Sequence, residues 1–390
     1  MAQTSRGLAI LGSTGSIGRS ALDVVDRLEG RFRVTALAAG SNTALVAAQI
    51  ERYRPALVSV AGRREAERLR PAARRFGTKI VHGPEGAVEA ARAEGAEVVV
   101  SAITGMSGFR PTLEAVRAGR RVALANKESL VVGGGLLRKE ASRSGAELVP
   151  VDSEHSGVFQ CLARVRRGHV RRVVLTASGG PFLKTPLREL ASKTVEEALR
   201  HPRWVMGRKV TVDSATLMNK GLELIEARWL FGLEPGELDV LIHPQSAVHA
   251  LVEMRDGSVL AQLGATDMRI PIQYALTYPD RLDSGLPALD LAALRRLEFF
   301  AVDARRYPLF GLARAALAAG GSLPVALNAA NEAAVAAFLE RRVPFPAIHA
   351  AVAGVMDGHR ARPADSYDQI IDIDAEARRA ARRLLTQRQT

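Results

Sequence analysis

Residues 7–18 read GLAILGSTGSIG, a short apolar run followed by glycines at positions 12, 15 and 18. Glycines at this spacing allow a tight turn after a first β-strand, close approach of the backbone to a pyrophosphate, and packing of the next helix on the sheet. An amphipathic segment, residues 20–28, follows directly. This order of strand, glycine loop and helix predicts a nucleotide-binding domain, with a purely structural glycine turn as the alternative.

Short apolar runs recur as far as residue 151. After the first run they occupy residues 34–39, 57–60, 79–82, 97–103, 122–125 and 148–151. They alternate with segments of helical periodicity and show little internal alternation, which is typical of parallel strands buried on both faces. We therefore predict an α/β fold whose residues 1–150 form a Rossmann-like parallel sheet.

The pattern changes in the middle of the chain. Apolar runs now lie at residues 173–176, 238–242 and 247–263, and the last run is interrupted by Asp256-Gly257, a sequence that favours a tight hairpin turn. This mixture predicts a central α+β catalytic domain over residues 151–277. Proline and glycine punctuation predicts a linker over residues 278–304, and the alanine-rich remainder predicts a C-terminal α-helical domain, residues 305–390.

Composition limits the classes of protein. The chain has 390 residues, of which 47% are hydrophobic and 24% charged, as in globular proteins of two or three domains. The net charge is +13, but arginine pairs are dispersed along the chain, so we expect no nucleic-acid binding. No apolar run reaches the roughly 18 residues of a spanning helix, so we expect no membrane or signal segment and a cytoplasmic location. Cys161, the one cysteine, excludes an intramolecular disulfide.

The second apolar run ends in Gly40, Ser41 and Asn42. In NAD-preferring enzymes an acidic residue near this point holds the ribose 2′-hydroxyl. No carboxylate is present in this stretch to repel a 2′-phosphate, so the sequence favours NADP. The alternative is an ordinary loop, with the ribose contacts made elsewhere.

Asp152 and Glu154 follow the last strand of the first domain. In an extended chain, residues two apart point to the same face, and adjacent carboxylates repel unless a cation lies between them. Ligation by oxygen alone suits Mg²⁺ or Mn²⁺ rather than Zn²⁺. A solvated strand end is the alternative.

Residues 209–223 are the densest polar stretch. If the chain is helical from Leu217 onward, Glu223 is a surface neighbour of both Asn219 and Lys220. Lys220 then offers a cation for a phosphate and Glu223 a third carboxylate for a metal. The alternative is an ordinary Lys-Glu surface pair.

Two further segments resemble a lid. Residues 176–182 end a strand in a glycine loop, and residues 201–207 contain His201, Trp204 and Met206. We expect a flexible loop over about 178–208 that closes over a small substrate. Alternatively, Trp204 is a core anchor, the usual fate of an isolated tryptophan.

Together these motifs resemble one family over essentially the whole chain, the 1-deoxy-D-xylulose 5-phosphate reductoisomerases. The resemblance also includes motifs over residues 125–129, 242–246, 267–269 and 327–332, in the family's order. It implies a homodimeric enzyme that uses NADPH and Mg²⁺, Mn²⁺ or Co²⁺ to convert 1-deoxy-D-xylulose 5-phosphate to 2-C-methyl-D-erythritol 4-phosphate, in the methylerythritol phosphate route to isoprenoids.

The resemblance also implies residue roles. The metal ligands would be Asp152, Glu154 and Glu223, and the catalytic residues Lys127, Glu154, His201 and Glu223. Substrate would be bound by those four residues with Ser153, Ser178, Trp204, Met206, Ser214, Asn219 and Lys220, of which Ser178, Ser214, Asn219 and Lys220 hold its phosphate. The cofactor residues would be Thr14, Gly15, Ser16, Ile17, Gly40, Ser41, Asn42, Asn126, Glu128 and Gly207.

One position departs from the family, because some members carry a lysine where this chain has Ser41. Two other classes of protein stay open on the residues alone. One is a different two-domain NADP-dependent dehydrogenase, and the other is a non-catalytic NADP sensor. A dependence of turnover on metal would separate the three.

Overall fold

The computed structural model describes residues 5–204 and 206–386, which form two compact units. Val205, in the predicted closing loop, lies outside the described residues. Unit 1 contains the chain up to residue 129 together with residues 137–156 and 267–286, and unit 2 contains residues 130–136, 157–266 and 287 onward. Helices α6 (Lys127–Ser144) and α7 (Ser153–Cys161) contribute residues to both units.

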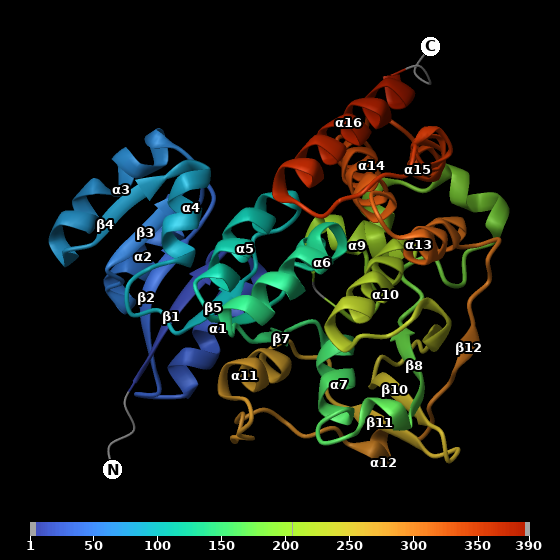
Figure 1. The fold of residues 1–390 in the computed structure, drawn as a ribbon, viewed down its shortest axis with the longest axis horizontal. Helices are drawn as coiled ribbons and strands as arrows, with labels where there is room; N and C mark the ends of the chain where they lie inside the picture. The colour runs from blue at the N-terminus through green and yellow to red at the C-terminus, as the bar shows by residue number, and fades with distance from the viewer. Residues whose placement is uncertain (1–4, 205, 387–390) are drawn as a thin grey trace. The chain divides into compact units, whose positions relative to one another are not determined.

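Unit 1 is built on a seven-stranded parallel sheet with the order β4-β3-β2-β1-β5-β6-β7 (Figure 1). Its strands are β1 (Arg6–Leu11), β2 (Phe32–Ala38), β3 (Leu57–Val60), β4 (Lys79–His82), β5 (Val98–Ser101), β6 (Arg121–Leu124) and β7 (Leu148–Pro150). Every strand predicted in this region is present. Central positions such as Leu8, Ile10 and Val99 have no exposed surface, as expected for strands covered on both faces. The predicted Rossmann-like sheet is confirmed.

Helices connect these strands, which is the usual way to join parallel strands. The helices of unit 1 are α1 (Ser16–Arg27), α2 (Thr43–Tyr53), α3 (Arg63–Phe76), α4 (Gly83–Ala91), the 3₁₀ turn η1 (Met106–Gly108), α5 (Phe109–Arg117) and α11 (Arg269–Thr277). Helix α11 comes late in the chain but belongs to this unit, where Arg269 forms ion pairs with Asp23 and Asp267.

The carboxyl ends of the parallel strands bring several candidate residues to one edge of the sheet. Strands β6 and β7 are neighbours, and Leu124 of β6 is paired with Pro150 of β7. The residues that follow these strands, Lys127 and Asp152, are therefore close in space although they lie far apart in the sequence. Ligands of open α/β sheets are bound at this edge.

Unit 2 contains a mixed sheet of five strands with the order β11-β10-β8-β9-β12. The strands are β8 (Val170–Ala177), β9 (Leu238–Ile242), β10 (Val248–Met254), β11 (Val259–Leu263) and β12 (Phe300–Ala301). Strands β8 and β9 are parallel, whereas β10 and β11 form the predicted antiparallel hairpin around Asp256-Gly257. Strand β12 lies in the segment predicted to be a linker and pairs with β9.

Helices make up the rest of unit 2. They are the 3₁₀ turns η2 (Arg167–His169), η3 (Leu187–Ser192) and η4 (Pro235–Glu237), and α8 (Val195–Ala198), α9 (Arg208–Ala215), α10 (Met218–Phe231), α12 (Leu291–Leu294), α13 (Pro308–Ala319), α14 (Leu323–Leu339), α15 (Pro346–Gly358) and α16 (Tyr367–Thr386). The described residues after 302 contain no strand, in agreement with the predicted helical C-terminal region.

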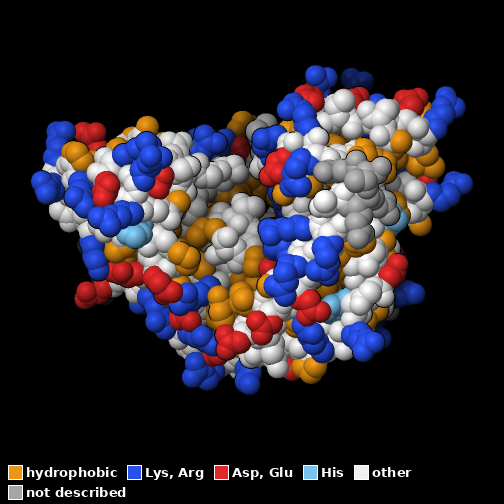
Figure 2. Space-filling view, turned by 90° about the horizontal axis from the view of Figure 1, so that it is seen from above, with side chains coloured by type: hydrophobic (Ala, Val, Ile, Leu, Met, Phe, Trp, Pro, Cys, Tyr) orange, Lys and Arg blue, Asp and Glu red, His pale blue; other side chains and the backbone are white. Residues whose placement is uncertain are grey.

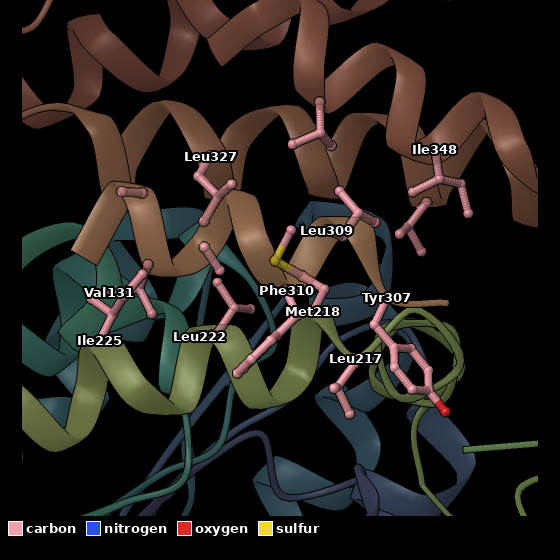
Figure 3. Packing of buried hydrophobic residues seen from close by; sticks show 14 of the residues in the cluster. Val131, Leu217, Met218, Leu222, Ile225, Tyr307, Leu309, Phe310, Leu327 and Ile348 are labelled. Carbon is pink, nitrogen blue, oxygen red and sulfur yellow. The ribbon is translucent and has the colours of Figure 1, made fainter. Parts of the chain in front are cut away.

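The core of unit 2 surrounds α10. Met218, Leu222 and Ile225 of this helix pack with Leu309 and Phe310 among other buried side chains (Figure 3). Helix α10 is buried over most of its length, and its buried residues include Lys220 and Glu223 as well as apolar side chains. The polar side chains that it carries are therefore held on a helix fixed by packing.

Charged side chains of both signs are scattered over the face shown in Figure 2, with Asp and Glu among the Lys and Arg side chains and uncharged surface between them. Many arginines form surface ion pairs, such as Arg172 with Asp239 and Glu253. Across residues 5–204 and 206–386, no helix has the length and apolar character needed to cross a membrane.

Candidate active site

The glycine loop after β1 has the shape predicted for a pyrophosphate site. Gly15 is the N-cap of α1, and no side chain caps the start of this helix. A Cβ on Gly18 would lie 2.2 Å from the Gly12 carbonyl oxygen, so α1 approaches the loop too closely for any larger residue. Gly15 and Ser16 are exposed at the helix start, where N–H groups and the helix dipole favour an anion. The loop therefore fits a dinucleotide phosphate.

Gln49 fixes this loop and was not predicted. Its side chain donates to the Ser13 carbonyl at 3.0 Å and accepts from the Ser13 hydroxyl at 2.8 Å, and both side chains are buried. No motif in the sequence distinguishes Gln49 from other residues of an amphipathic helix.

The loop after β2 contains the residues predicted to accept a 2′-phosphate. Gly40 has open space where a side chain would begin, and Ser41 and Asn42 are exposed. Asn42 is also the N-cap of α2, because its Oδ1 accepts from the Leu45 N–H at 3.2 Å. No acidic side chain lies between residues 38 and 50, so the loop suits an anion.

Asn126 and Glu128 follow β6 and are both buried. Asn126 Oδ1 accepts from the Ser129 N–H, while Nδ2 donates to the carbonyls of Ile103 and Gly105 and to Glu128. Asn126 therefore joins the loops after β5 and β6. That Asn126 and Glu128 contact the cofactor remains a prediction.

Lys127 and Asp152 form an ion pair at the carboxyl edge of the unit 1 sheet. Lys127 Nζ lies 3.0 Å from Asp152 Oδ2, and the two side chains are 8% and 18% exposed. His155 Nδ1 lies 3.6 Å from the other carboxylate oxygen. The pair places an ammonium group beside a carboxylate in a largely enclosed position.

The expected extended geometry of Asp152 and Glu154 is wrong. The strand ends at Pro150, and Ser153, Glu154 and the residues after them form the first turn of α7. Asp152 Oδ1 accepts from the Glu154 N–H at 3.2 Å, the type of bond by which an aspartate stabilises a helix start. Ser153 donates to the Glu154 carboxylate. The three polar residues are thus grouped by a helix start instead of a strand.

In unit 2, Ser178 follows β8 and contacts His201. Ser178 Oγ lies 2.8 Å from His201 Nε2, and the Gly180 N–H donates to the same oxygen. His201 Nδ1 accepts from the N–H groups of Arg203 and Trp204, so the proton of a neutral imidazole is on Nε2 and is donated to Ser178. The Ser178 hydroxyl oxygen accepts two N–H hydrogen bonds, and its own proton can be donated to another group.

Ser214 lies against the same glycine loop. A Cβ on Gly180 would lie 2.5 Å from the Ser214 carbonyl oxygen, and Gly180 has a φ of +69°, so only glycine allows this approach. Ser178 and Ser214 are both half-buried. The structure therefore brings these two predicted phosphate ligands onto adjoining segments.

Helix α10 carries the remaining predicted ligands of unit 2. It begins at Met218, after Leu217 with a φ of +60°. Asn219 donates to one oxygen of Glu223 and Lys220 donates to the other, as the predicted helix requires. Lys220 is 3% exposed and Glu223 is 0% exposed, so the alternative of a solvated surface pair is wrong.

The predicted closing loop contains His201, Trp204, Met206 and Gly207. Trp204 is half-buried and absent from the buried core, which disagrees with the core-anchor alternative. Its ring centroid lies 6.3 Å from that of His249, a buried residue of β10 that was not predicted as part of a site. A histidine in an apolar strand gives no signal of this contact.

A parallel sheet with a glycine loop after its first strand is typical of oxidoreductases that use NAD or NADP. Three family models match this chain. The model for 1-deoxy-D-xylulose 5-phosphate reductoisomerase matches residues 8–134, and two models for the C-terminal domains of this enzyme match residues 148–231 and 263–380. The chain belongs to the 1-deoxy-D-xylulose 5-phosphate reductoisomerase family, and the resemblance noted in the sequence is confirmed.

Relatives of this name are similar over their full length. The protein of Chlorobium chlorochromatii is 50% identical over 380 residues, with 97% of this chain and 100% of the relative covered. The protein of Ralstonia nicotianae is 52% identical over 379 residues, with 96% of each chain covered.

Two solved structures of this enzyme have the same fold. The Zymomonas mobilis enzyme in complex with NADPH has a TM-score of 0.91 at 42% identity, and 98% of this chain and 99% of that chain are covered. A complex of the enzyme with NADPH, fosmidomycin and magnesium has a TM-score of 0.94 at 39% identity, with 98% of each chain covered. NADPH and Mg²⁺, which are among the predicted cofactors, are present in these complexes.

Proposed function

We propose that this chain converts 1-deoxy-D-xylulose 5-phosphate to 2-C-methyl-D-erythritol 4-phosphate with NADPH and a divalent metal, in the isoprenoid route that the resemblance implies. The observation that carries the proposal is the buried Lys220–Glu223 pair on α10, in the same unit as Ser178 and Ser214. A buried cation and two hydroxyls suit a phosphate, whereas a carboxylate is a ligand for a hard metal ion.

The proposed metal ligands are Asp152, Glu154 and Glu223. The donor set fits a hard cation, because all three residues supply carboxylate oxygens, which Mg²⁺ and Mn²⁺ prefer. When bound, the ion supplies Lewis-acid polarisation of the substrate's ketone and the neighbouring hydroxyl. In the proposal, Ser153 and Lys127 contact the substrate's oxygens. The positively charged Lys127 ammonium would stabilise negative charge that develops on a substrate oxygen during the reaction.

The phosphate would be bound by Ser178, Ser214, Asn219 and Lys220. Ser178 has a proton to donate, because its oxygen already accepts N–H groups from His201 and Gly180. Lys220 adds a charge-assisted bond in a position with little water, where such bonds are strong. Fixing the phosphate orders the reacting end of the sugar, so binding energy remote from the chemistry assists the reaction.

His201, Trp204 and Met206 would cover the substrate and exclude water. His201 joins the two segments of the proposed lid, since its Nε2 contacts Ser178 and its Nδ1 accepts from the Trp204 N–H at 2.8 Å. Rotation of this imidazole would therefore alter both the phosphate contact and the position of Trp204. This connection supports a lid that closes when phosphate is bound.

Most of the proposed NADPH contacts belong to unit 1. The pyrophosphate would lie at the start of α1 near Thr14, Gly15, Ser16 and Ile17, where Gly15 and Ser16 are exposed. The 2′-phosphate would lie at Gly40, Ser41 and Asn42. Asn126, Glu128 and Gly207 complete the proposed cofactor residues.

We also propose a homodimer. Large apolar side chains are exposed on the two edge strands of the unit 2 sheet and just before β12: Val259 is 52% exposed, Leu260 40%, Phe299 38% and Phe300 51%. An exposed apolar strand edge is suited to pairing with a second copy of the chain. Sedimentation equilibrium should give twice the chain mass for the parent protein, and the chain mass alone would contradict the proposal.

The experiment that tests the activity is NADPH oxidation with 1-deoxy-D-xylulose 5-phosphate, with and without a chelator. We expect turnover that chelation abolishes and added Mg²⁺ or Mn²⁺ restores. A sensor would bind NADPH without turnover, and another dehydrogenase would be insensitive to the chelator. The cytoplasmic location is part of the proposal, and fractionation of cells tests it.

A further inference from the structure

The two segments that supply the proposed phosphate ligands are both hydrogen-bonded to the C-terminal part of unit 2. The Tyr307 hydroxyl donates to the Gly179 carbonyl oxygen at 2.8 Å. Asn331 Nδ2 donates to Asp213 Oδ1, also at 2.8 Å. Tyr307 is 1% exposed and Asn331 and Asp213 are 0% exposed, so both bonds are shielded from water.

Each bond acts one residue from a proposed ligand. Gly179 directly follows Ser178, and Asp213 directly precedes Ser214. Asp213 also forms an ion pair with Lys209 in the first turn of α9, at a distance of 2.9 Å between Nζ and Oδ2. The carboxylate therefore connects Asn331 of α14 with the helix whose last turn carries Ser214.

The glycine loop requires such a restraint. Gly179 and Gly180 are consecutive and both have positive φ, at +84° and +69°. Glycine has more conformational freedom than any other residue, so this geometry is weakly favoured by the chain itself. Burial raises the pKa of Tyr307 to about 12, so its hydroxyl keeps the proton that it donates to Gly179. Tyr307 belongs to the buried hydrophobic cluster and is labelled in Figure 3.

We propose that Tyr307 and Asn331 are positioning residues for phosphate recognition. Tyr307 sets the glycine loop that carries Ser178, and Asn331 sets the end of α9 that carries Ser214. The inference rests on the proposed function, because it assumes that these two serines bind the phosphate of the substrate. Residues of the C-terminal part of unit 2 thereby affect substrate affinity through the segments that carry the two serines.

The test uses the full-length variants Tyr307→Phe and Asn331→Leu, with inorganic phosphate as the probe. Each substitution roughly preserves side-chain size and removes one hydrogen bond. We expect the Kd for phosphate and the KM for the phosphorylated substrate to rise about fivefold in Tyr307→Phe, and about tenfold or more in Asn331→Leu, because the Asn331 bond is to a carboxylate. The Kd for NADPH should stay unchanged. Asn328→Leu is the matched control, because Asn328 lies on the same helix, is 0% exposed, and bonds within that helix to Glu332.

A purely structural role would give a different pattern. It would lower the melting temperature of all three variants, and the folded Tyr307→Phe and Asn331→Leu proteins would bind phosphate with the same Kd as Asn328→Leu. This result would overturn the inference. The variant Ser214→Ala distinguishes failure of the positioning role from failure of the proposed phosphate site. If Ser214→Ala weakens phosphate binding while Tyr307→Phe and Asn331→Leu do not, only the positioning role fails. If Ser214→Ala also has no effect, the proposed phosphate site itself is wrong.

The variant Asn331→Asp provides a second test of Asn331 if Asn331→Leu folds poorly. An aspartate at this position can donate to Asp213 only when it is protonated. The Kd for phosphate, relative to that of the parent protein at each pH, should therefore improve as the pH falls. A ratio that is constant with pH would contradict the role of Asn331.

Discussion

Lys220 and Glu223 lie one turn apart on α10 and form an ion pair that is almost completely shielded from water, with side chains 3% and 1% exposed. An exposed pair of this spacing would contribute only about 0.3 to 0.5 kcal/mol to stability. Charges removed from water are costly unless they are paired, so a buried pair on a packed helix is expected where the charges have a further use.

Lys220→Met should weaken binding of the phosphorylated substrate about tenfold to a hundredfold, because it removes a charge-assisted bond of about 1.5 to 3 kcal/mol. The substitution also leaves Glu223 buried without its cation, which costs about 3 to 5 kcal/mol of stability. Kinetics must therefore be measured on folded protein at low temperature. Unphosphorylated deoxyxylulose is the internal control, and an equal proportional loss on both sugars would show that Lys220 does not recognise the phosphate.

Glu223→Gln should abolish most activity while leaving the affinity for NADPH unchanged, because it removes one anionic ligand from the proposed metal site and the cofactor loop lies in unit 1. NADPH fluorescence and the steady-state rate, titrated against Mg²⁺ in the same preparation, check this. Excess Mg²⁺ should restore part of the rate. A parallel loss of NADPH binding and rate would point to misfolding instead.

NADPH should be preferred over NADH, because the loop at Gly40, Ser41 and Asn42 has no carboxylate to repel a 2′-phosphate. The measurement is kcat/KM for each cofactor at fixed substrate. Ser41→Asp should reduce the preference by adding a negative charge at this loop. Equal efficiency of the parent protein with both cofactors would contradict the assignment.

Trp204→Ala should raise the KM for the substrate and slow turnover with little change in melting temperature. Trp204 is half-buried and lies outside the buried core, so its truncation should not incur the roughly 3 to 5 kcal/mol typical of a core tryptophan. Differential scanning calorimetry and steady-state kinetics on the same variant distinguish the two roles. A large fall in melting temperature with unchanged kinetics would favour a core anchor.

Local patterns predicted the fold well. The strands around residues 57–60, 79–82 and 238–242 agree with β3, β4 and β9 residue for residue, because each is a short segment containing Val, Ile or Leu that lies next to turn residues. The relation of Glu223 to Asn219 and Lys220 was also predictable, since helical spacing alone brings them together. The start of α7 was missed because Asp152 and Ser153 resemble a strand end as much as a helix cap.

Contacts between distant residues were not predictable. Nothing in the sequence around Gln49 points to Ser13, 36 positions away, and His249 gives no sign of Trp204. The burial of Lys220 likewise depends on how α10 packs within unit 2. Periodicity reports which face of an element is apolar but does not specify which element covers it.

Tyr307 follows its hydrogen-bond partner Gly179 by 128 positions, and Asn331 follows Asp213 by 118. A chain that is still being synthesised therefore contains Ser178 and Ser214 long before it contains the groups that hold them in place. Unit 1, by contrast, has its glycine loop, its β2 loop and Gln49 within the first 50 residues. In the growing protein, these residues of the cofactor loops are synthesised close together, whereas the groups that hold the two proposed phosphate ligands come only with the last third of the chain.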